Sequence, residues 1–145
     1  LENDFVKGLI SKVGLSDDIL REIDVVEDAT KENDGLTLYI ALNYGSREEM
    51  ITAIKKISRE ISDGSLSADE IDEETISKHL YTFETTDPDL IIRPSGERRL
   101  SNFLLWQSAY SEFWFDDINW PDFTTNDLDR AIIDFQKRNR RYGGV

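Results

Sequence analysis

The sequence predicts an α/β fold, built on a mostly parallel sheet that is flanked by helices. Two apolar runs, residues 36–42 and 90–92, have the length and composition of buried strands. Each is followed by a polar loop and then by residues with the apolar spacing of a helix. A strand that is apolar along its second half needs cover on both faces, which is the situation of strands in a parallel sheet.

Length and charge limit the classes of function. At 145 residues the chain can form one compact domain with a core, and without cysteine it has neither disulfides nor thiolate chemistry. The net charge of −13 argues against a nucleic-acid partner, and no apolar run is long enough to span a bilayer. Seven of the 17 basic residues lie in two clusters in the last third of the chain: Arg93, Arg98, Arg99, Lys137, Arg138, Arg140 and Arg141. Such clusters on an acidic chain indicate local anion binding.

The first basic cluster lies where a ligand site is expected in an α/β sheet. Arg93 ends an apolar strand, a turn follows, and Ser101 stands just before a predicted helix of residues 101–110. Unpaired amides at a helix start and forked guanidinium donors together favour a phosphate or diphosphate ligand. The alternative is a set of surface arginines with Ser101 as an ordinary N-cap. For the second cluster, the alternative is a cationic helix end favoured by the helix dipole.

The remaining elements follow from apolar spacing and turn residues. Helices are predicted over residues 1–13, from Ser16 to about residue 32, over 46–61, near 72–79 and over 125–139, and a further strand over 112–115. A capping box of Ser46 and Glu49 is expected to begin the third helix. The apolar residues of the helices from Ser16 and from Ser46 are expected to be buried: Ile19, Leu20, Ile23, Val26, Ala29, Met50, Ile51, Ile54, Ile57 and Ile61. The acidic run 72–74 fits either a metal site or, better, a solvated helix start, and an aromatic cluster over 106–120 fits core or interface better than lipid contact.

Three stretches of the chain carry a family resemblance. The run IRPSGERRLSNFLLWQSAYSEFWF, with WPDF after it, closely resembles the C-terminal signature of cis-prenyltransferases of the undecaprenyl diphosphate synthase type. The stretches NYGSR at 43–47 and RRYGG at 140–144 are similar to that family too, and the resemblance runs from about residue 15 to the end. Ser46 stands where a glycine is common, and Arg98 where some relatives have histidine.

The resemblance implies a fold, a reaction and a set of residues. The fold is the undecaprenyl diphosphate synthase-like fold, and the reaction condenses isopentenyl diphosphate with an allylic diphosphate to give a cis-polyprenyl diphosphate, undecaprenyl diphosphate for the cell-wall lipid carrier being the expected product. By position, Arg93, Arg99 and Ser101 would hold isopentenyl diphosphate, and Glu97 would orient the arginines. Glu112 would be a ligand of the cofactor Mg²⁺, a hard oxygen donor for a hard cation. The Arg-x-Gly element at Arg141 and Gly143 would reach a diphosphate across a homodimer.

The same resemblance predicts what the chain lacks. Family members carry a catalytic aspartate and a Gly-Asn-Gly-Arg-type phosphate loop in an N-terminal segment, which no stretch of this sequence matches. Residues 1–145 are therefore expected to be the C-terminal part of a single cis-prenyltransferase domain without its N-terminal strands, with no catalytic residue and no activity alone. The expected location is cytoplasmic, with at most peripheral membrane contact through the lipid product. Two alternatives stay open, a noncatalytic partner subunit and a diphosphate-binding fragment without activity.

Spacing also bears on assembly. In a continuous helix, Ser101 and Glu112 would lie about 16 Å apart, too far for one diphosphate and its metal. Either the chain folds back after Tyr110 or Glu112 serves the site of a second subunit, and the aromatic cluster favours the latter.

Overall fold

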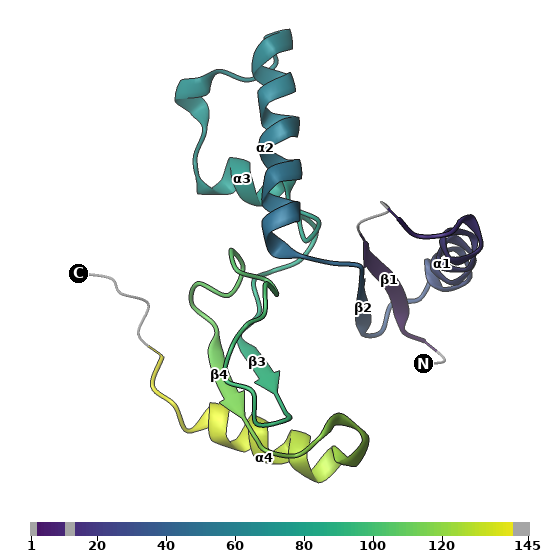
Figure 1. Ribbon diagram of the computed structural model, residues 1–145, viewed down its shortest axis with the longest axis vertical. Helices are drawn as coiled ribbons and strands as arrows, with labels where there is room; N and C mark the ends of the chain where they lie inside the picture. The colour runs from purple at the N-terminus through teal and green to yellow at the C-terminus, as the bar shows by residue number, and fades with distance from the viewer. Residues whose placement is uncertain (1–2, 11–13, 141–145) are drawn as a thin grey trace. The chain divides into compact units, whose positions relative to one another are not determined.

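The computed structural model describes residues 3–10 and 14–140 of the chain. These residues fall into two compact units, with the division between Thr85 and Thr86 (Figure 1). Each unit contains one pair of parallel strands with helices beside it, which confirms the predicted α/β class. In the described part of the chain, no helix is long and apolar enough to cross a membrane.

The first unit begins with a strand–helix–strand element. Strand β1 (Phe5–Ile10) pairs in parallel with β2 (Thr37–Leu42), and helix α1 (Asp17–Thr30) connects them (Figure 1). The predicted helix over residues 1–13 is therefore wrong. Its apolar spacing is compatible with a helix, but the six residues of β1 obtain backbone partners along the whole length of β2, and this pairing overrides a short periodic pattern.

Side chains of helix α1 accept hydrogen bonds from backbone amides of β1. The amide of Gly8 donates to Glu27 Oε1 at 2.8 Å, and the amide of Val6 donates to Thr30 Oγ1 at 3.1 Å. The expected burial of the apolar face of α1 is wrong, since no residue of this helix is buried. The side chains instead border an open apolar cavity of about 360 Å³ between α1 and the two strands, which Ile19, Ile23, Val26, Ile40 and Leu42 help to line. Strand β2 is likewise mostly exposed within its unit, so the expected cover on both faces is absent from the described residues.

Helix α2 (Ser46–Asp63) is followed by a 3₁₀ turn, η1 (Ala68–Glu70), and by α3 (Glu73–His79). Its buried stripe consists of Ser46, Glu49, Ala53 and Ile57. Of the apolar residues expected in the core, Ile57 is buried, but Ile51, Ile54 and Ile61 are exposed. The predicted capping box is also wrong, because Gly45 is the N-cap and Ser46 is already helical.

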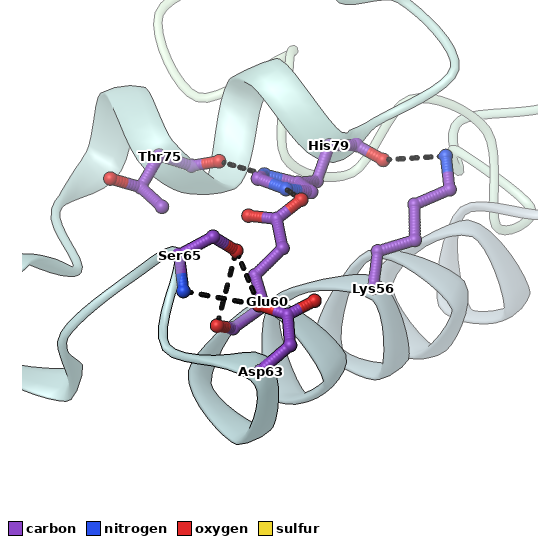
Figure 2. Close-up of polar contacts among 6 residues, drawn as sticks. All are labelled: Lys56, Glu60, Asp63, Ser65, Thr75 and His79. Atoms are coloured by element: carbon purple, nitrogen blue, oxygen red, sulfur yellow. Dashed lines mark hydrogen bonds and ion pairs between the residues drawn. The ribbon is translucent and has the colours of Figure 1, made fainter.

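Helices α2 and α3 are joined through the single histidine (Figure 2). His79 Nε2 lies 2.9 Å from Glu60 Oε1 on α2, and Nδ1 lies 2.7 Å from the carbonyl oxygen of Thr75. Lys56 Nζ contacts the carbonyl oxygen of His79 at 3.5 Å. The acidic start of α3 is an ordinary helix start, since Asp72 caps it by accepting the amide of Thr75 at 2.7 Å.

The second unit carries the site. Strand β3 (Leu90–Arg93) pairs in parallel with β4 (Glu112–Phe115), and η2 (Trp120–Asp122) leads into helix α4 (Thr125–Gln136) (Figure 1). The predicted helix over 101–110 is wrong, because this segment is a series of turns. Ser101, Asn102 and Leu104 have φ angles of 50°, 64° and 46°, and left-handed residues interrupt a right-handed helix.

Candidate anion-binding site

The candidate site lies at the carboxyl end of strand β3, where Arg93 is the last strand residue. The turn that follows is held by two backbone hydrogen bonds, from the amide of Ser95 to the carbonyl of Ile118 at 2.7 Å and from the amide of Gly96 to the carbonyl of Asp116 at 2.9 Å. Gly96 has a φ of 69°, and a Cβ there would approach the Asp117 carboxylate to 3.2 Å. These two bonds hold the turn against the segment that follows β4. Arg98 and Arg99 come directly after the turn.

Two of the predicted arginines meet at one pocket. A cavity of about 210 Å³ lies beside the strand end. Its lining combines Arg93 and Arg99 with apolar side chains: Ile91, Ile92, Pro94, Leu100, Phe103, Phe113, Phe115 and Trp120. The arrangement is that of a small-molecule site, mostly apolar with a few convergent polar groups. Three members of the aromatic cluster over 106–120 line this pocket, namely Phe113, Phe115 and Trp120.

Arg93 has an unsatisfied donor. Its Nη2 lies 3.4 Å from Ser101 Oγ, so the structure brings these two predicted residues together. Its Nε is buried and has no hydrogen-bond partner among the described residues. A buried N–H of a guanidinium without an acceptor is costly, and an anionic oxygen would satisfy it.

Arg99 already has an anionic partner. Its Nη1 forms an ion pair with Glu97, the residue predicted to orient the arginines. The Arg99 side chain is 66% exposed, so this pair is screened by water and contributes little to stability. A ligand anion could therefore take the place of the Glu97 carboxylate at low cost. Because residues 101–110 are not a helix, the predicted contribution of a helix dipole is absent, and the arginine side chains carry the positive charge.

Glu112 lies at the other end of the strands. It pairs with Leu90 in the register, three residues before the Arg93 position, which amounts to about 10 Å along the strands. Its Oε2 accepts from Arg138 Nη1 at 2.8 Å. The pKa of Arg138 is raised because the Glu112 carboxylate, and next that of Asp134, hydrogen-bond to the guanidinium.

The predicted magnesium ligand therefore has a guanidinium as its neighbour rather than further oxygen donors. Within residues 3–10 and 14–140, no group of three or more acidic or histidine side chains could hold a metal ion. Mg²⁺ takes six oxygens in octahedral geometry, usually from waters, substrate phosphates and one or two carboxylates, so Glu112 could supply one of them only after leaving Arg138. The residues of this part of the chain thus do not fit the ion by themselves. Arg141 and Gly143 lie outside the described residues.

Two sets of contacts are not predicted by the sequence. The second basic cluster is expected to bind an anion or, as the alternative, to be a cationic helix end, whereas Arg138 and Arg140 bind specific acceptors at the start of the strands. Glu49 is expected in a capping box, whereas this residue is fully buried and accepts from the Tyr44 hydroxyl at 2.6 Å and the Tyr81 amide at 2.8 Å. A glutamate three residues into a helix gives no signal that would separate a cap from a buried anchor.

Together these observations define an α/β protein with an arginine-lined pocket at the carboxyl end of a strand. The sequence model of the prenyltransferase family described as "Putative undecaprenyl diphosphate synthase" matches residues 6–143, and the chain belongs to this family. The match begins at Val6, well before the start near residue 15 that the motifs suggested.

Individual relatives agree with the family match. An isoprenyl transferase of Halalkalibacterium halodurans is 60% identical over 118 residues, which are 81% of this chain and 46% of the relative. An isoprenyl transferase of Shouchella clausii is 50% identical over 144 residues, 99% of this chain and 56% of the relative. The chain thus spans about half the length of the curated relatives it matches.

Solved structures resemble the chain as well. The crystal structure of lavandulyl diphosphate synthase from Lavandula x intermedia in complex with dimethylallyl diphosphate has a TM-score of 0.94 and 36% identity, covering 97% of this chain and 61% of that one. A structure titled "probable undecaprenyl diphosphate synthase" from Campylobacter jejuni has a TM-score of 0.84 and 33% identity, covering 99% of this chain and 64% of that one. The undecaprenyl diphosphate synthase-like fold expected from the sequence is confirmed.

Proposed function

We propose that the chain is the C-terminal part of a single cis-prenyltransferase domain and that its arginine pocket binds the diphosphate of isopentenyl diphosphate. The buried, unpartnered Nε of Arg93 is the observation that carries the proposal. A diphosphate oxygen would satisfy this donor, and the apolar lining of the same pocket would accept the short isopentenyl group. The relatives named isoprenyl transferase support this reaction class.

The reaction of the full-length enzyme joins two isoprenoids. The bond between the allylic carbon and its diphosphate breaks, the double bond of isopentenyl diphosphate forms a new carbon–carbon bond, and a proton is lost to leave a cis double bond. Within this proposal Arg93, Arg99 and Ser101 bind and orient the isopentenyl diphosphate, so that its alkene faces the allylic carbon. Glu97 releases Arg99 to the substrate and holds that side chain when the pocket is empty. The catalytic aspartate is expected on a segment that this sequence does not contain.

The proposal includes Mg²⁺, a homodimer and an undecaprenyl product, all of which come from the family resemblance. When bound, Mg²⁺ would neutralise charge on the departing diphosphate. Glu112 stays the candidate ligand in this chain, but its pairing with Arg138 means that an ion would have to displace a guanidinium. The separation of about 10 Å between Glu112 and Arg93 favours a site shared between subunits.

Substrate binding is tested by alanine variants of the full-length enzyme. Arg99→Ala should raise the KM for isopentenyl diphosphate by about 10- to 100-fold, since a charge-assisted contact is worth roughly 1.5–3 kcal/mol. Arg98→Ala is the matched control, because Arg98 is the adjacent arginine and does not line the pocket. A KM near that of the unaltered enzyme in Arg99→Ala, or an equal rise in Arg98→Ala, would refute the assignment.

The alternative is a diphosphate-binding fragment without chemistry, which the relatives named isoprenyl transferase do not favour. The 145-residue chain should bind inorganic pyrophosphate in calorimetry yet incorporate no labelled isopentenyl diphosphate. Incorporation by the chain alone would overturn the expectation that catalysis needs the further segment.

A shared site is tested by complementation. At isopentenyl diphosphate concentrations below the KM of the unaltered enzyme, full-length Arg99→Ala should have little activity because its KM is raised, and full-length Glu112→Ala should also have little activity. When their subunits are mixed and mixed dimers form, some dimers regain one intact site if Glu112 serves the partner. Mixed dimers without activity would show that Glu112 acts within its own chain.

A further inference from the structure

Asp116, the first residue after β4, is bonded to both ends of the turn that follows β3. Its amide donates to the carbonyl of Arg93 at 3.3 Å, and its carbonyl accepts from the amide of Gly96 at 2.9 Å. Its side-chain Oδ1 accepts from the amide of Ile118 at 3.0 Å. The carbonyl of Ile118 in turn accepts from the amide of Ser95 at 2.7 Å. Asp116 therefore holds the turn directly through its backbone and indirectly through the segment that its side chain fixes.

Helix α4 supplies the cation that holds the Asp116 carboxylate. Arg130 Nη2 donates to Asp116 Oδ2 at 2.9 Å, and the guanidinium lies 5.6 Å from the centre of the Trp114 ring. The Asp116 side chain is only 21% exposed. Because each carboxylate oxygen bonds to a different donor, the side chain cannot rotate without losing a contact, and α4 is joined to the segment after β4.

The turn has a backbone conformation that needs such support. Ser95 and Gly96 have φ angles of 76° and 69°, so two successive residues are left-handed. This region is unfavourable for serine, which has a Cβ. Unfavourable backbone angles persist where the surrounding contacts determine them. The bonds from residues 116–118 to the two amides are contacts of this kind.

Arg99 is the pocket residue whose place depends on the turn. Arg93 belongs to β3 and is fixed by the pairing with β4. Arg99 comes after the turn, in a segment that is neither helix nor strand, yet it lines the same pocket as Arg93. The course of the turn therefore decides where the Arg99 side chain begins.

We propose that Asp116, held by Arg130, is a positioning residue that fixes the turn and thereby places Arg99 beside Arg93 in the diphosphate pocket. This rests on the proposed function, in which both arginines bind isopentenyl diphosphate. Asp116 and Arg130 are not among the residues that line the pocket, so they act through the turn. A turn that is fixed before the substrate arrives lowers the entropic cost of binding.

The test uses full-length enzyme carrying Asp116→Ala, with Asp127→Ala as the matched control. Asp127 Oδ1 also forms an ion pair with Arg130, at 3.0 Å, and Asp127 Oδ2 accepts from the amide of Thr124 at 2.8 Å. Each substitution removes an ion pair with Arg130 and an acceptor of a backbone amide. The contacts of Asp127, however, stay within α4 and its N-cap.

The two variants should differ in substrate binding. Asp116→Ala should raise the KM for isopentenyl diphosphate about tenfold with kcat changed less than about twofold, since two contacts that support the turn are lost. Asp127→Ala should lower the melting temperature but leave KM unchanged. Asp116→Asn keeps an acceptor for the Ile118 amide and loses the bond from Arg130, so it should raise KM only about threefold. Arg130→Met should match that value, and Arg130→Lys should recover part of the loss.

A double variant shows whether the effect passes through Arg99. Asp116→Ala should add little to the KM of an Arg99→Ala enzyme, because the positioned group is already gone. Hydrogen exchange at the amides of Ser95 and Gly96 should quicken in Asp116→Ala and not in Asp127→Ala. Full additivity, unchanged exchange in Asp116→Ala, or an equal rise in KM in Asp127→Ala would overturn the positioning role.

The outcomes separate the positioning role from the function beneath it. If Arg99→Ala raises KM while Asp116→Ala, Asp116→Asn and Arg130→Met do not, the positioning role alone is wrong. If Arg99→Ala leaves KM unchanged, the proposed diphosphate site is wrong, and Asp116 has no pocket residue to place.

Discussion

Protonation of His79 should control how firmly α3 is held against α2 (Figure 2). Both ring nitrogens face acceptors, the Thr75 carbonyl at 2.7 Å and the Glu60 carboxylate at 2.9 Å. Neither acceptor can donate at neutral pH, so both hydrogen bonds form only when the imidazole carries two protons. The pKa of His79 is raised, first by the bond to the Thr75 carbonyl and then by the bond to Glu60, against opposing effects of burial and of Lys56.

The sign of the pH dependence follows from that direction. Because the pKa is higher in the folded chain than the ordinary 6.5, the stabilisation is fully present below pH 6.5 and is lost as pH rises through the folded value. On deprotonation, one ring nitrogen turns a lone pair toward an acceptor. The Glu60 side chain is 41% exposed, so its pair contributes about 0.5–1 kcal/mol, and the Thr75 bond adds about 1 kcal/mol. His79→Leu should therefore lower the melting temperature by roughly 3–8 °C near pH 6, and the difference should shrink as pH rises through the folded pKa of His79.

The assay is an NMR titration, which needs no assignment because the chain has a single histidine. The midpoint in the unaltered chain should lie above 6.5, Glu60→Gln should lower it, and Lys56→Met should raise it further. Glu74→Gln is the control, since Glu74 pairs with Lys78 on the same helix and not with His79. A midpoint at or below 6.5, or one that Glu60→Gln leaves unchanged, would refute the reasoning.

Substitutions at three further positions test a buried anchor and two helix ends of the first unit. Glu49→Gln should destabilise the chain by about 2 kcal/mol in urea unfolding, because a fully buried carboxylate accepts two hydrogen bonds there, and a loss under about 0.5 kcal/mol would contradict an anchoring role. Gly64→Ala should cost about 1 kcal/mol, since Gly64 ends α2 at a φ of 83°, while Gly64→Asn should cost less; equal losses would point to another cause. Asp72→Ala should lower the melting temperature at pH 7, because Asp72 accepts hydrogen bonds as the N-cap of α3 and these lower its pKa. The difference in melting temperature between the variant and the unaltered chain should vanish as pH falls well below 3.8. A difference that does not depend on pH would rule out the capping role.

The sequence predicted those elements whose local pattern and tertiary partners agree. Residues 90–93 and 112–115 are rich in apolar and aromatic side chains and became β3 and β4. Residues 5–10 also satisfy a helical spacing, and only the pairing with β2 decides for a strand. In residues 101–110 the apolar spacing favours a helix, but three left-handed residues redirect the backbone, and no local preference of serine or leucine signals such angles.

The same distinction applies to the site. Arg93, Arg99 and Ser101 could be grouped from the sequence because they lie within nine residues of one strand end. The contact between Glu112 and Arg138 spans 26 residues, and it depends on the register of β3 with β4 and on the residue at which α4 ends. Neither the strand register nor the end of α4 can be identified from a short motif. The sequence therefore does not distinguish a basic cluster whose arginines bind carboxylates of the same chain from one whose arginines bind a ligand.

Charge compensation decides which end of the β3–β4 pair can bind a substrate anion. At the amino end, the arginines at 138 and 140 are already matched by the carboxylates of Glu112 and Asp89, so an anion there would gain little. At the carboxyl end, Arg93 and Arg99 line one pocket, and the ion pair of Arg99 is with the partly exposed Glu97, which water screens and a ligand anion could replace. A diphosphate would therefore gain most at the carboxyl end, which is also where ligands bind in open α/β sheets. The amino end, with its charges balanced, is suited to holding the chain in place.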